Sequence, residues 1–322
     1  MAEPIRMGVL GCADIARRRM LPAFAACPDT EVTAVAGRDA ARAGETARPY
    51  GALAFGGYAE LLADPSVDAV YVPVPLALHS RWVEAALRAG KHVLAEKPLT
   101  GDAGETERLF ALAERQGRAL MENVMFVHHG QHRRVRELLA EGAVGELRSF
   151  EASFTVPRRP DDDIRYRADL GGGALFDTGV YPLRAALHLL GPELSVAGAV
   201  LEHGPGFGVD TSGAVLLRTP KGVLAQLSFG LDHAYRGSYT LHGSTGRLTL
   251  DRVFTPPADL VPVARIEGPA GVREIPLAAE DQVAATVAAF AAACREGSAP
   301  SAQSLAQARL LDAVVRAARA AV

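Results

Sequence analysis

Short apolar runs alternate with amphipathic helical patterns through the first 122 residues of the chain. Continuous apolar runs of this length are typical of parallel strands that helices cover on both faces. The predicted strands lie at residues 5–10, 31–36, 54–55, 68–72, 92–95 and 119–122. The helical patterns between them lie at about 14–26, 39–47, 58–63, 79–89 and 102–116. This alternation predicts an α/β domain built on a doubly wound parallel sheet.

The pattern changes from about residue 146, where predicted strands follow one another directly. One helical stretch near 174–190 interrupts them, and two alanine-rich helices at about 281–295 and 302–320 close the chain. A run of adjacent strands predicts an α+β domain with a mainly antiparallel sheet. Two domains, 1–122 and 123–322, also suit a length of 322 residues, which exceeds the usual size of one hydrophobic core. The predicted strands are 146–156, 194–202, 212–218, 223–230, 237–243 and 246–251.

Charge and cysteine usage narrow the class of partner. The net charge is −3, and the basic residues are scattered, so we expect neither a nucleic-acid nor a membrane partner. The three cysteines have no paired or metal-ligand spacing, and the N-terminus lacks a leader pattern. No apolar run approaches the roughly 20 residues that cross a bilayer. These features predict a cytoplasmic protein that acts on a small metabolite.

The turn after the first strand is a candidate dinucleotide site. Gly11 ends that strand, and the next residues, Cys12, Ala13, Asp14 and Ile15, open a helix. Backbone N–H groups at such a helix start can hold a pyrophosphate. Alanine occupies the second and third glycine positions of the G-x-G-x-x-G template, so the motif alone is a weak match, and an ordinary strand-to-helix turn is the alternative.

The end of the second strand bears on the choice of cofactor. An acidic residue here usually binds the ribose of NAD, but this strand ends in Gly37 and Arg38. Arg38 could pair with a 2′-phosphate and stack on adenine, which favours NADP. The alternative is a solvated arginine beside Asp39, with the aspartate capping the next helix.

A lysine follows the strand predicted at 92–95. Because Pro98 cannot continue a strand ladder, we expect pairing to end at Lys97. The carboxyl edge of a doubly wound sheet is where such folds bind ligands, so Lys97 is the candidate reaction centre.

The second domain carries another candidate cluster. A glycine run at 171–173 precedes a predicted helix, in which Asp177 and Tyr181 are four residues apart and share a face. A core tyrosine with an aspartate favoured by the helix dipole is the alternative. His128 and His132 are also four apart, but no third ligand stands nearby, so we predict no metal site.

These motifs together resemble the glucose-fructose oxidoreductase / inositol dehydrogenase (Gfo/Idh/MocA) family. The resemblance rests on the Gly11 turn, on Pro75 followed by His79, on Glu96-Lys97-Pro98, and on the glycine run leading to Asp177 and Tyr181. Within the family the chain looks most like actinobacterial NDP-sugar 3-ketoreductases of deoxysugar biosynthesis. That likeness runs nearly end to end, through the stretches 17–22, 69–73, 128–130, 163–167, 179–183 and 254–258.

The resemblance implies an N-terminal Rossmann domain and a C-terminal open-faced sheet that commonly serves oligomerisation, here in a homodimer or homotetramer. It implies NADPH as cofactor, with Pro73, Pro75, His79 and Glu96 joining the Gly11 turn in the cofactor site. The implied reaction reduces the C-3 ketone of a dTDP-linked 3,4-diketo-2,6-dideoxyhexose to a dTDP-4-keto-2,6-dideoxyhexose. One departure is Gly37, which stands where NADPH-binding relatives often have serine.

Roles follow from the chemistry of ketone reduction. Tyr181 is the first candidate for proton donor, Lys97 would hydrogen-bond the substrate oxygen and favour the ionised phenol, and Asp177 would orient the pair. Lys97 could instead donate the proton itself. The family's polyol dehydrogenases often carry histidine at the position of Tyr181.

A nucleotide substrate also needs donors for its phosphates. Arginine matches phosphate oxygens in a bidentate way. The candidates are Arg165, Arg167, Tyr235 and Arg236, although a solvated loop is an alternative for the first two. The acidic run at 161–163 would repel phosphate and is interpreted as an exposed loop.

Two other functions fit parts of the pattern. An NADP-dependent dehydrogenase of a free sugar, polyol or trans-diol would share every cofactor motif. A non-catalytic dinucleotide-binding regulator would share the fold, but the retention of lysine, aspartate and tyrosine together argues against it.

Overall fold

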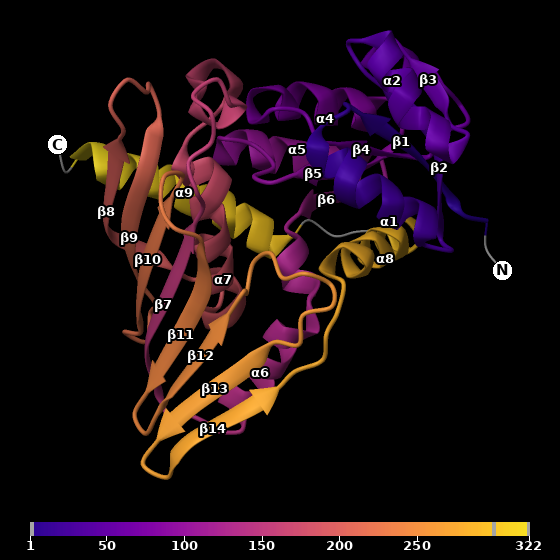
Figure 1. The fold of residues 1–322 in the computed structure, drawn as a ribbon. Helices are drawn as coiled ribbons and strands as arrows, with labels where there is room; N and C mark the ends of the chain where they lie inside the picture. Colours follow the sequence, from indigo (N-terminus) through magenta and orange to yellow (C-terminus); the bar gives the residue numbers. More distant parts are fainter. Residues whose placement is uncertain (1–2, 298–300, 321–322) are drawn as a thin grey trace. The chain divides into compact units, whose positions relative to one another are not determined.

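A computed structural model describes residues 3–297 and 301–320 of the chain (Figure 1). The chain divides into two compact units, each described here by itself. The first spans Met1–Asn123 and Val283–Ser301, and the second spans Val124–Gln282 and Ala302–Val322. The division falls next to the boundary predicted at residue 122. The sequence did not indicate that the segment 283–301 belongs with the first unit.

The first unit is built on a parallel sheet, which confirms the predicted doubly wound architecture. Its six strands in the described residues have the order β3-β2-β1-β4-β5-β6. The order reverses beside β1, and in open α/β sheets ligands bind at such a switch point. The strands are β1 (Ile5–Leu10), β2 (Thr30–Ala36), β3 (Leu53–Phe55), β4 (Ala69–Val72), β5 (His92–Glu96) and β6 (Leu120–Asn123).

Helices cover this sheet (Figure 1), and side chains cap the starts of two of them. Asp39 and Asp102 precede two of them, and each side chain accepts backbone N–H bonds from the first turn. Helix α8 comes from the C-terminal part of the chain but packs in this unit. Its Arg295 Nη1 forms an ion pair of 2.6 Å with Asp29 Oδ1. The helices are α1 (Leu21–Ala26), α2 (Ala40–Ala47), α3 (Tyr58–Ala63), α4 (His79–Arg88), α5 (Ala103–Arg115) and α8 (Gln282–Glu296, of which Gln282 belongs to the second unit).

The second unit is built on a mainly antiparallel sheet, again as predicted. Its eight strands in the described residues have the order β14-β13-β12-β11-β7-β10-β9-β8, and only the β7–β10 pair is parallel. The hairpin β13–β14 extends the sheet beyond the six strands that the sequence predicted. The strands are β7 (Leu147–Thr155), β8 (Ser195–His203), β9 (Asp210–Arg218), β10 (Leu224–Gly230), β11 (Arg236–Gly243), β12 (Arg247–Asp251), β13 (Val263–Gly268) and β14 (Gly271–Pro276).

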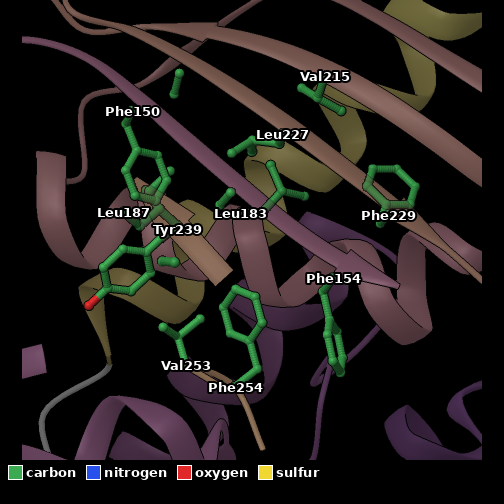
Figure 2. Packing of buried hydrophobic residues seen from close by; sticks show 14 of the residues in the cluster. Phe150, Phe154, Leu183, Leu187, Val215, Leu227, Phe229, Tyr239, Val253 and Phe254 are labelled. Carbon is green, nitrogen blue, oxygen red and sulfur yellow. The ribbon is translucent and has the colours of Figure 1, made fainter. Parts of the chain in front are cut away.

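Alternating side chains of this sheet form a core with helices α6 (Gly130–Ala140), α7 (Val180–Leu190) and α9 (Ala302–Ala320). Figure 2 shows Phe150, Leu227 and Tyr239 of the strands packed toward Leu183 and Leu187 of α7. The α6 helix was not predicted. Side chains that alternate to the other face of the sheet are largely accessible.

His132 of α6 is buried in this core as a neutral ring. Its Nε2 faces the carbonyl oxygen of Val253 at 3.1 Å, and its Nδ1 lies 3.0 Å from the hydroxyl of Tyr239. A carbonyl only accepts, so Nε2 carries the proton and Nδ1 accepts from the tyrosine. Burial, with smaller contributions from the nearby His188 and His129, lowers the pKa of His132 to about 3. His132, for which the sequence predicted no metal-binding role, therefore serves the packing of this core.

This burial predicts a pH-dependent stability. In the unfolded chain His132 protonates as pH falls through about 6.5, whereas the folded ring stays neutral, so the unfolded state binds more protons and stability falls. His132→Gln keeps a donor and an acceptor but cannot titrate. We expect the variant to lose about 1.4 kcal/mol less stability between about pH 7.5 and about pH 5.5 than wild type. Urea unfolding at both pH values measures this, with His203→Gln, an exposed histidine, as control. An unchanged pH dependence would contradict the neutral assignment.

Among the described residues, no helix is both long and apolar enough to cross a membrane.

Candidate active site

Three neighbouring strands of the first unit end at one edge of the sheet. Because β1, β4 and β5 are parallel and adjacent, the residues after them lie side by side. These residues are Gly11 after β1, Pro73 after β4 and Lys97 after β5. Pro75 follows in the same loop and begins a short 3₁₀ turn. Lys97 thus lies at the carboxyl edge of the parallel sheet, where the sequence predicted it.

The Gly11 turn has the geometry of a phosphate-binding helix start. Gly11 has a φ of 127°, which favours glycine, and its N–H donates to Ala36 O at 2.9 Å. The first bond within the following helix runs from Arg17 N to Ala13 O. The N–H groups of residues 14–16 thus have no partner within the helix, and they are available for an anion.

The end of β2 lies beside this turn. A side chain at Gly37 would meet Cys12 Sγ at 3.3 Å, so glycine leaves the two segments in close contact. Asp39 caps α2 by accepting from the N–H groups of Ala41 and Arg42, which is the capping role considered for it from the sequence. Arg38 is exposed at this edge.

Two further residues join this end of the site, and the sequence reading missed both. Arg42, in the first turn of α2, donates from Nη2 to Cys12 O at 3.1 Å and so lies across the turn. Tyr58 places its hydroxyl next to Gly11. Burial raises the pKa of Tyr58, and the charge of Arg38 acts in the opposite direction. Neither contact had a local sequence signal, because each joins segments that are far apart in the chain.

Lys97 follows β5, which extends one residue beyond the predicted strand 92–95, and whose pairing ends at Glu96 instead of at Lys97. The last pair of the β5–β6 ladder is Glu96 with Asn123, since Pro98 has no N–H with which to continue it. The Lys97-Pro98 peptide is cis. The Glu96 carboxylate accepts from Tyr71 Oη and from Asn123 Nδ2, each at 2.6 Å. Glu96 is thus fixed by two neighbouring strands at the base of the lysine turn.

His79, predicted to join the cofactor site, is buried behind this turn. Its Nε2 faces Val74 O at 2.8 Å, and its Nδ1 faces Pro98 O and Leu99 O at 3.0 and 3.2 Å. Glu122 Oε1 accepts from the N–H of Leu99. With a side chain only 1% exposed, His79 fastens the turn from inside, and we do not include it among the cofactor ligands.

In the second unit, the glycine run lies against two other segments. Gly173 has a φ of 121°, and a side chain there would collide with Asp210 of β9. Gly172 has no room for a side chain because the backbone of Arg165 packs against it. Asp210 Oδ2 accepts from the N–H of Leu175 at 2.7 Å and so caps the helix. Burial raises the pKa of Asp210, although that hydrogen bond opposes the shift.

Asp177 is held by an arginine that the sequence assigned to phosphate. Arg165 donates from Nε to Asp177 Oδ2 at 2.8 Å and from Nη1 to Asp163 Oδ1 at 3.0 Å. Burial disfavours the charge on Arg165, but the two carboxylates outweigh this and raise its pKa. Its carbonyl also accepts from Gly173 N–H at 2.9 Å. Arg165 therefore holds the helix start at two points, and its guanidinium is engaged by two carboxylates.

Tyr181 is the second residue of α7, which follows a wide π turn at Leu175–Gly179. Its ring packs among three phenylalanines, Phe126, Phe154 and Phe254, with centroid distances of 6.0, 4.7 and 5.7 Å. Phe154 and Phe254 are visible side by side in Figure 2. The ring is thus held on apolar neighbours while its side chain stays partly accessible.

The remaining predicted substrate residues lie in different surroundings. Arg167 is exposed and pairs with Asp169 at 2.6 Å. Arg236 donates to Ser238 Oγ, and both alternate to the face of β11 opposite the core residue Tyr239. Tyr235 packs edge-on against Phe154, the ring that also contacts Tyr181. We therefore do not propose Arg165, Arg167 or Arg236 as phosphate ligands.

No group of three or more ligating side chains suited to a metal occurs in residues 3–297 and 301–320.

A doubly wound sheet whose first strand ends in a positive-φ glycine and a free helix start defines a dinucleotide-binding protein. Family models agree: an "Oxidoreductase family, NAD-binding Rossmann fold" matches residues 5–124, and a "GFO/IDH/MocA C-terminal domain" matches residues 132–249. The chain belongs to the Gfo/Idh/MocA family of oxidoreductases, as the motifs predicted.

Two relatives are similar over almost the whole chain. The dTDP-3,4-didehydro-2,6-dideoxy-alpha-D-glucose 3-reductase of Actinomadura kijaniata is 54% identical over 321 residues, which cover 99% of this chain and 97% of that protein. The enzyme of the same name from Streptomyces violaceoruber is 55% identical over 326 residues, which cover 98% and 95%.

A solved structure adds the ligands of one relative. The 3-ketoreductase KijD10 from Actinomadura kijaniata, in complex with NADP and TDP-benzene, matches with a TM-score of 0.96 and 54% identity over 98% of each chain. Crystal structures also exist for KijD10 variants with a tyrosine replaced by phenylalanine and with a lysine replaced by alanine.

Proposed function

We propose that this protein uses NADPH to reduce the C-3 ketone of a dTDP-linked 3,4-diketo-2,6-dideoxyhexose to a dTDP-4-keto-2,6-dideoxyhexose. The observation that carries the proposal is the end-to-end similarity to 3-reductases of that substrate. The spacing of the candidate residues supports it further. Lys97 and Tyr181 are separated by the same number of residues as the substituted lysine and tyrosine of KijD10.

The residues at the carboxyl edge of the first sheet fit NADP. The free N–H groups after Gly11 would hold the pyrophosphate, and Arg38 and Arg42 would bind the 2′-phosphate. When bound, NADPH supplies the hydride that a ketone reduction needs. NAD sites usually have an acidic side chain at the end of the second strand, but β2 is followed by Gly37 and Arg38. The carboxylate of the next residue, Asp39, caps α2.

Residues of this chain would protonate the substrate oxygen and stabilise the charge that develops on it. Tyr181 would donate a proton to the oxygen as negative charge develops there. The Lys97 ammonium would stabilise that charge and orient the ketone through a hydrogen bond. Asp177, anchored by Arg165, would fix the position of the donor, so that Arg165 acts as a positioning residue.

The assigned 2′-phosphate site predicts a change in cofactor preference. Removing the guanidinium of Arg38 deletes a charged hydrogen bond to the phosphate, so Arg38→Ala should weaken NADPH binding about 10-fold or more and leave NADH binding nearly unchanged. Fluorescence titration with each cofactor measures both constants. Arg88→Ala, which removes an exposed arginine paired with Glu84, is the matched control. Equal weakening of NADPH and NADH binding would contradict the assignment.

Turnover tests the function itself. Loss of NADPH absorbance should follow addition of enzymatically generated dTDP-3,4-diketo-2,6-dideoxyglucose, and dTDP should inhibit. A free-sugar or polyol dehydrogenase would instead oxidise its substrate with NADP and ignore dTDP. Protein that binds NADPH but neither turns over the sugar nucleotide nor binds dTDP would refute the proposal.

We also propose that the protein forms a homodimer or homotetramer through the accessible face of its second sheet. Exposed apolar side chains on that face support this, because a sheet face that stayed in contact with water would favour polar residues. Sedimentation equilibrium measures the state, and a monomer at micromolar concentration would contradict it. The side chains are Val200, Leu216, Leu224 and Val263.

A further inference from the structure

The loop after β12 holds an arginine in an unusual backbone conformation. Arg252 has a φ of 54°, and it is the single non-glycine residue with positive φ in the part of the chain that the structure describes. Arginine is strained there relative to glycine. Backbone strain of this kind clusters at ligand sites, where the side chain's placement matters more than local stability.

The arginine side chain lies over an aromatic ring. Its guanidinium carbon is 4.7 Å from the centre of the Tyr235 ring. The Tyr235 hydroxyl lies 3.1 Å from Thr255 Oγ1, and Gly237 leaves room for that hydroxyl, since a side chain there would collide with it. Tyr235 is thus fixed as a platform, and stacking on it restricts the guanidinium.

This pair lies close to the candidate proton donor within the same unit. Tyr235 contacts Phe154 edge-on at 6.4 Å between ring centroids, and Phe154 contacts Tyr181 at 4.7 Å. One phenyl ring therefore separates the Arg252–Tyr235 pair from Tyr181. A sugar nucleotide whose sugar reaches Tyr181 extends further by its diphosphate and nucleoside, so it needs a cationic group at some distance from that hydroxyl.

Ion pairing distinguishes Arg252 from three other arginines of the second unit. Arg158, Arg165 and Arg167 each form ion pairs with one or two aspartates. Arg252 has no carboxylate within ion-pair distance in residues 3–297 and 301–320. A guanidinium stacked through its face keeps the N–H groups in its plane available, in the fork that matches phosphate oxygens.

We propose that Arg252, stacked on Tyr235, binds the diphosphate of the sugar-nucleotide substrate. The proposal rests on the proposed function, because it assigns a contact to the substrate of that reaction. Tyr235 supports the arginine and forms the wall of the site toward Phe154.

Binding of dTDP and of thymidine to Arg252→Gln tests the proposal without turnover. Loss of a charged phosphate contact should raise the Kd for dTDP about 10- to 100-fold. The Kd values for thymidine and NADPH should stay within about twofold, because neither ligand uses this contact. Isothermal titration calorimetry measures all three. Arg167→Gln, which removes an exposed arginine already paired with Asp169, is the matched control and should bind dTDP as wild type does.

A second variant separates binding from folding. Arg252→Gly removes the strained arginine from a positive φ, so it should raise the Tm by about 2 °C while weakening dTDP as much as the glutamine variant. Unchanged dTDP affinity in both variants, or equal weakening of thymidine, would overturn the assignment. Wild-type protein that fails to bind dTDP would overturn the proposed function as well, whereas dTDP binding and turnover that ignore Arg252 would overturn this inference alone.

Discussion

Lys97→Ala is expected to lower kcat for ketone reduction by about 10²- to 10⁴-fold. The loss follows from removing the ammonium that would stabilise charge on the substrate oxygen. The fold should survive, because the turn is fastened by Glu96, His79 and Glu122 and not by the lysine side chain alone. NADPH oxidation with the dTDP-diketosugar measures the effect, and a cofactor titration should show that NADPH still binds.

Lys221→Ala offers a matched control for this lysine. Lys221 is exposed in the turn between β9 and β10, so its removal should leave kcat unchanged. Lys97→Arg keeps a cation but changes its shape and should recover only part of the activity. Wild-type kcat in Lys97→Ala would remove the lysine from the reaction and require another group at that edge of the sheet.

Tyr181→Phe is expected to lower kcat by about 10²-fold or more, with little change in stability. The substitution removes one hydroxyl and keeps the ring that packs on Phe126, Phe154 and Phe254. Steady-state rates and a thermal unfolding curve measure the two effects. Tyr50→Phe, in the 3₁₀ turn Arg48–Tyr50 that follows α2, is a control that should change neither kcat nor the Tm.

The same two variants separate the alternatives for the proton donor. If tyrosine donates, the alkaline fall in kcat should disappear in Tyr181→Phe and persist in the residual activity of Lys97→Ala. The opposite result would assign the proton to the lysine. A kcat for Tyr181→Phe equal to wild type would leave the tyrosine only its packing role.

The strands of the first sheet could be predicted because each is a continuous apolar run between turn residues. Burial on both faces imposes that pattern, so no tertiary information was needed. The hairpin of β13 and β14 lacks it: most side chains of β14 are exposed, and its pairing depends on β13 alone. Helix α8 was predicted as a helix, but its return to the first unit depends on a contact as specific as Arg295 with Asp29.

The sequence motifs identified several residues of the candidate site, but they did not reveal which side chains contact one another in the fold. Gly11, Lys97 and Tyr181 carry local signals, namely a glycine, a proline that ends a strand, and a glycine run before a helix. Which carboxylate an arginine meets is a tertiary property, and for this reason Arg165 was assigned to phosphate although it holds Asp177. Arg252 offered no signal at all, because its positive φ is visible only in the folded backbone.

The π turn at Leu175–Gly179 makes the count of residues before Tyr181 as informative as their identity. Val180 N–H bonds back to Leu175 O, so the turn holds one residue more than an ordinary α-helical turn. Deleting one residue there would convert it to a regular helix and rotate everything beyond by about 100° relative to the glycine run. A relative with the same glycines, aspartate and tyrosine but a shorter interval would aim its tyrosine elsewhere. The number of residues between the glycine run and the tyrosine is therefore a criterion by which a reductase could be distinguished from a relative with the same motifs in a newly sequenced genome.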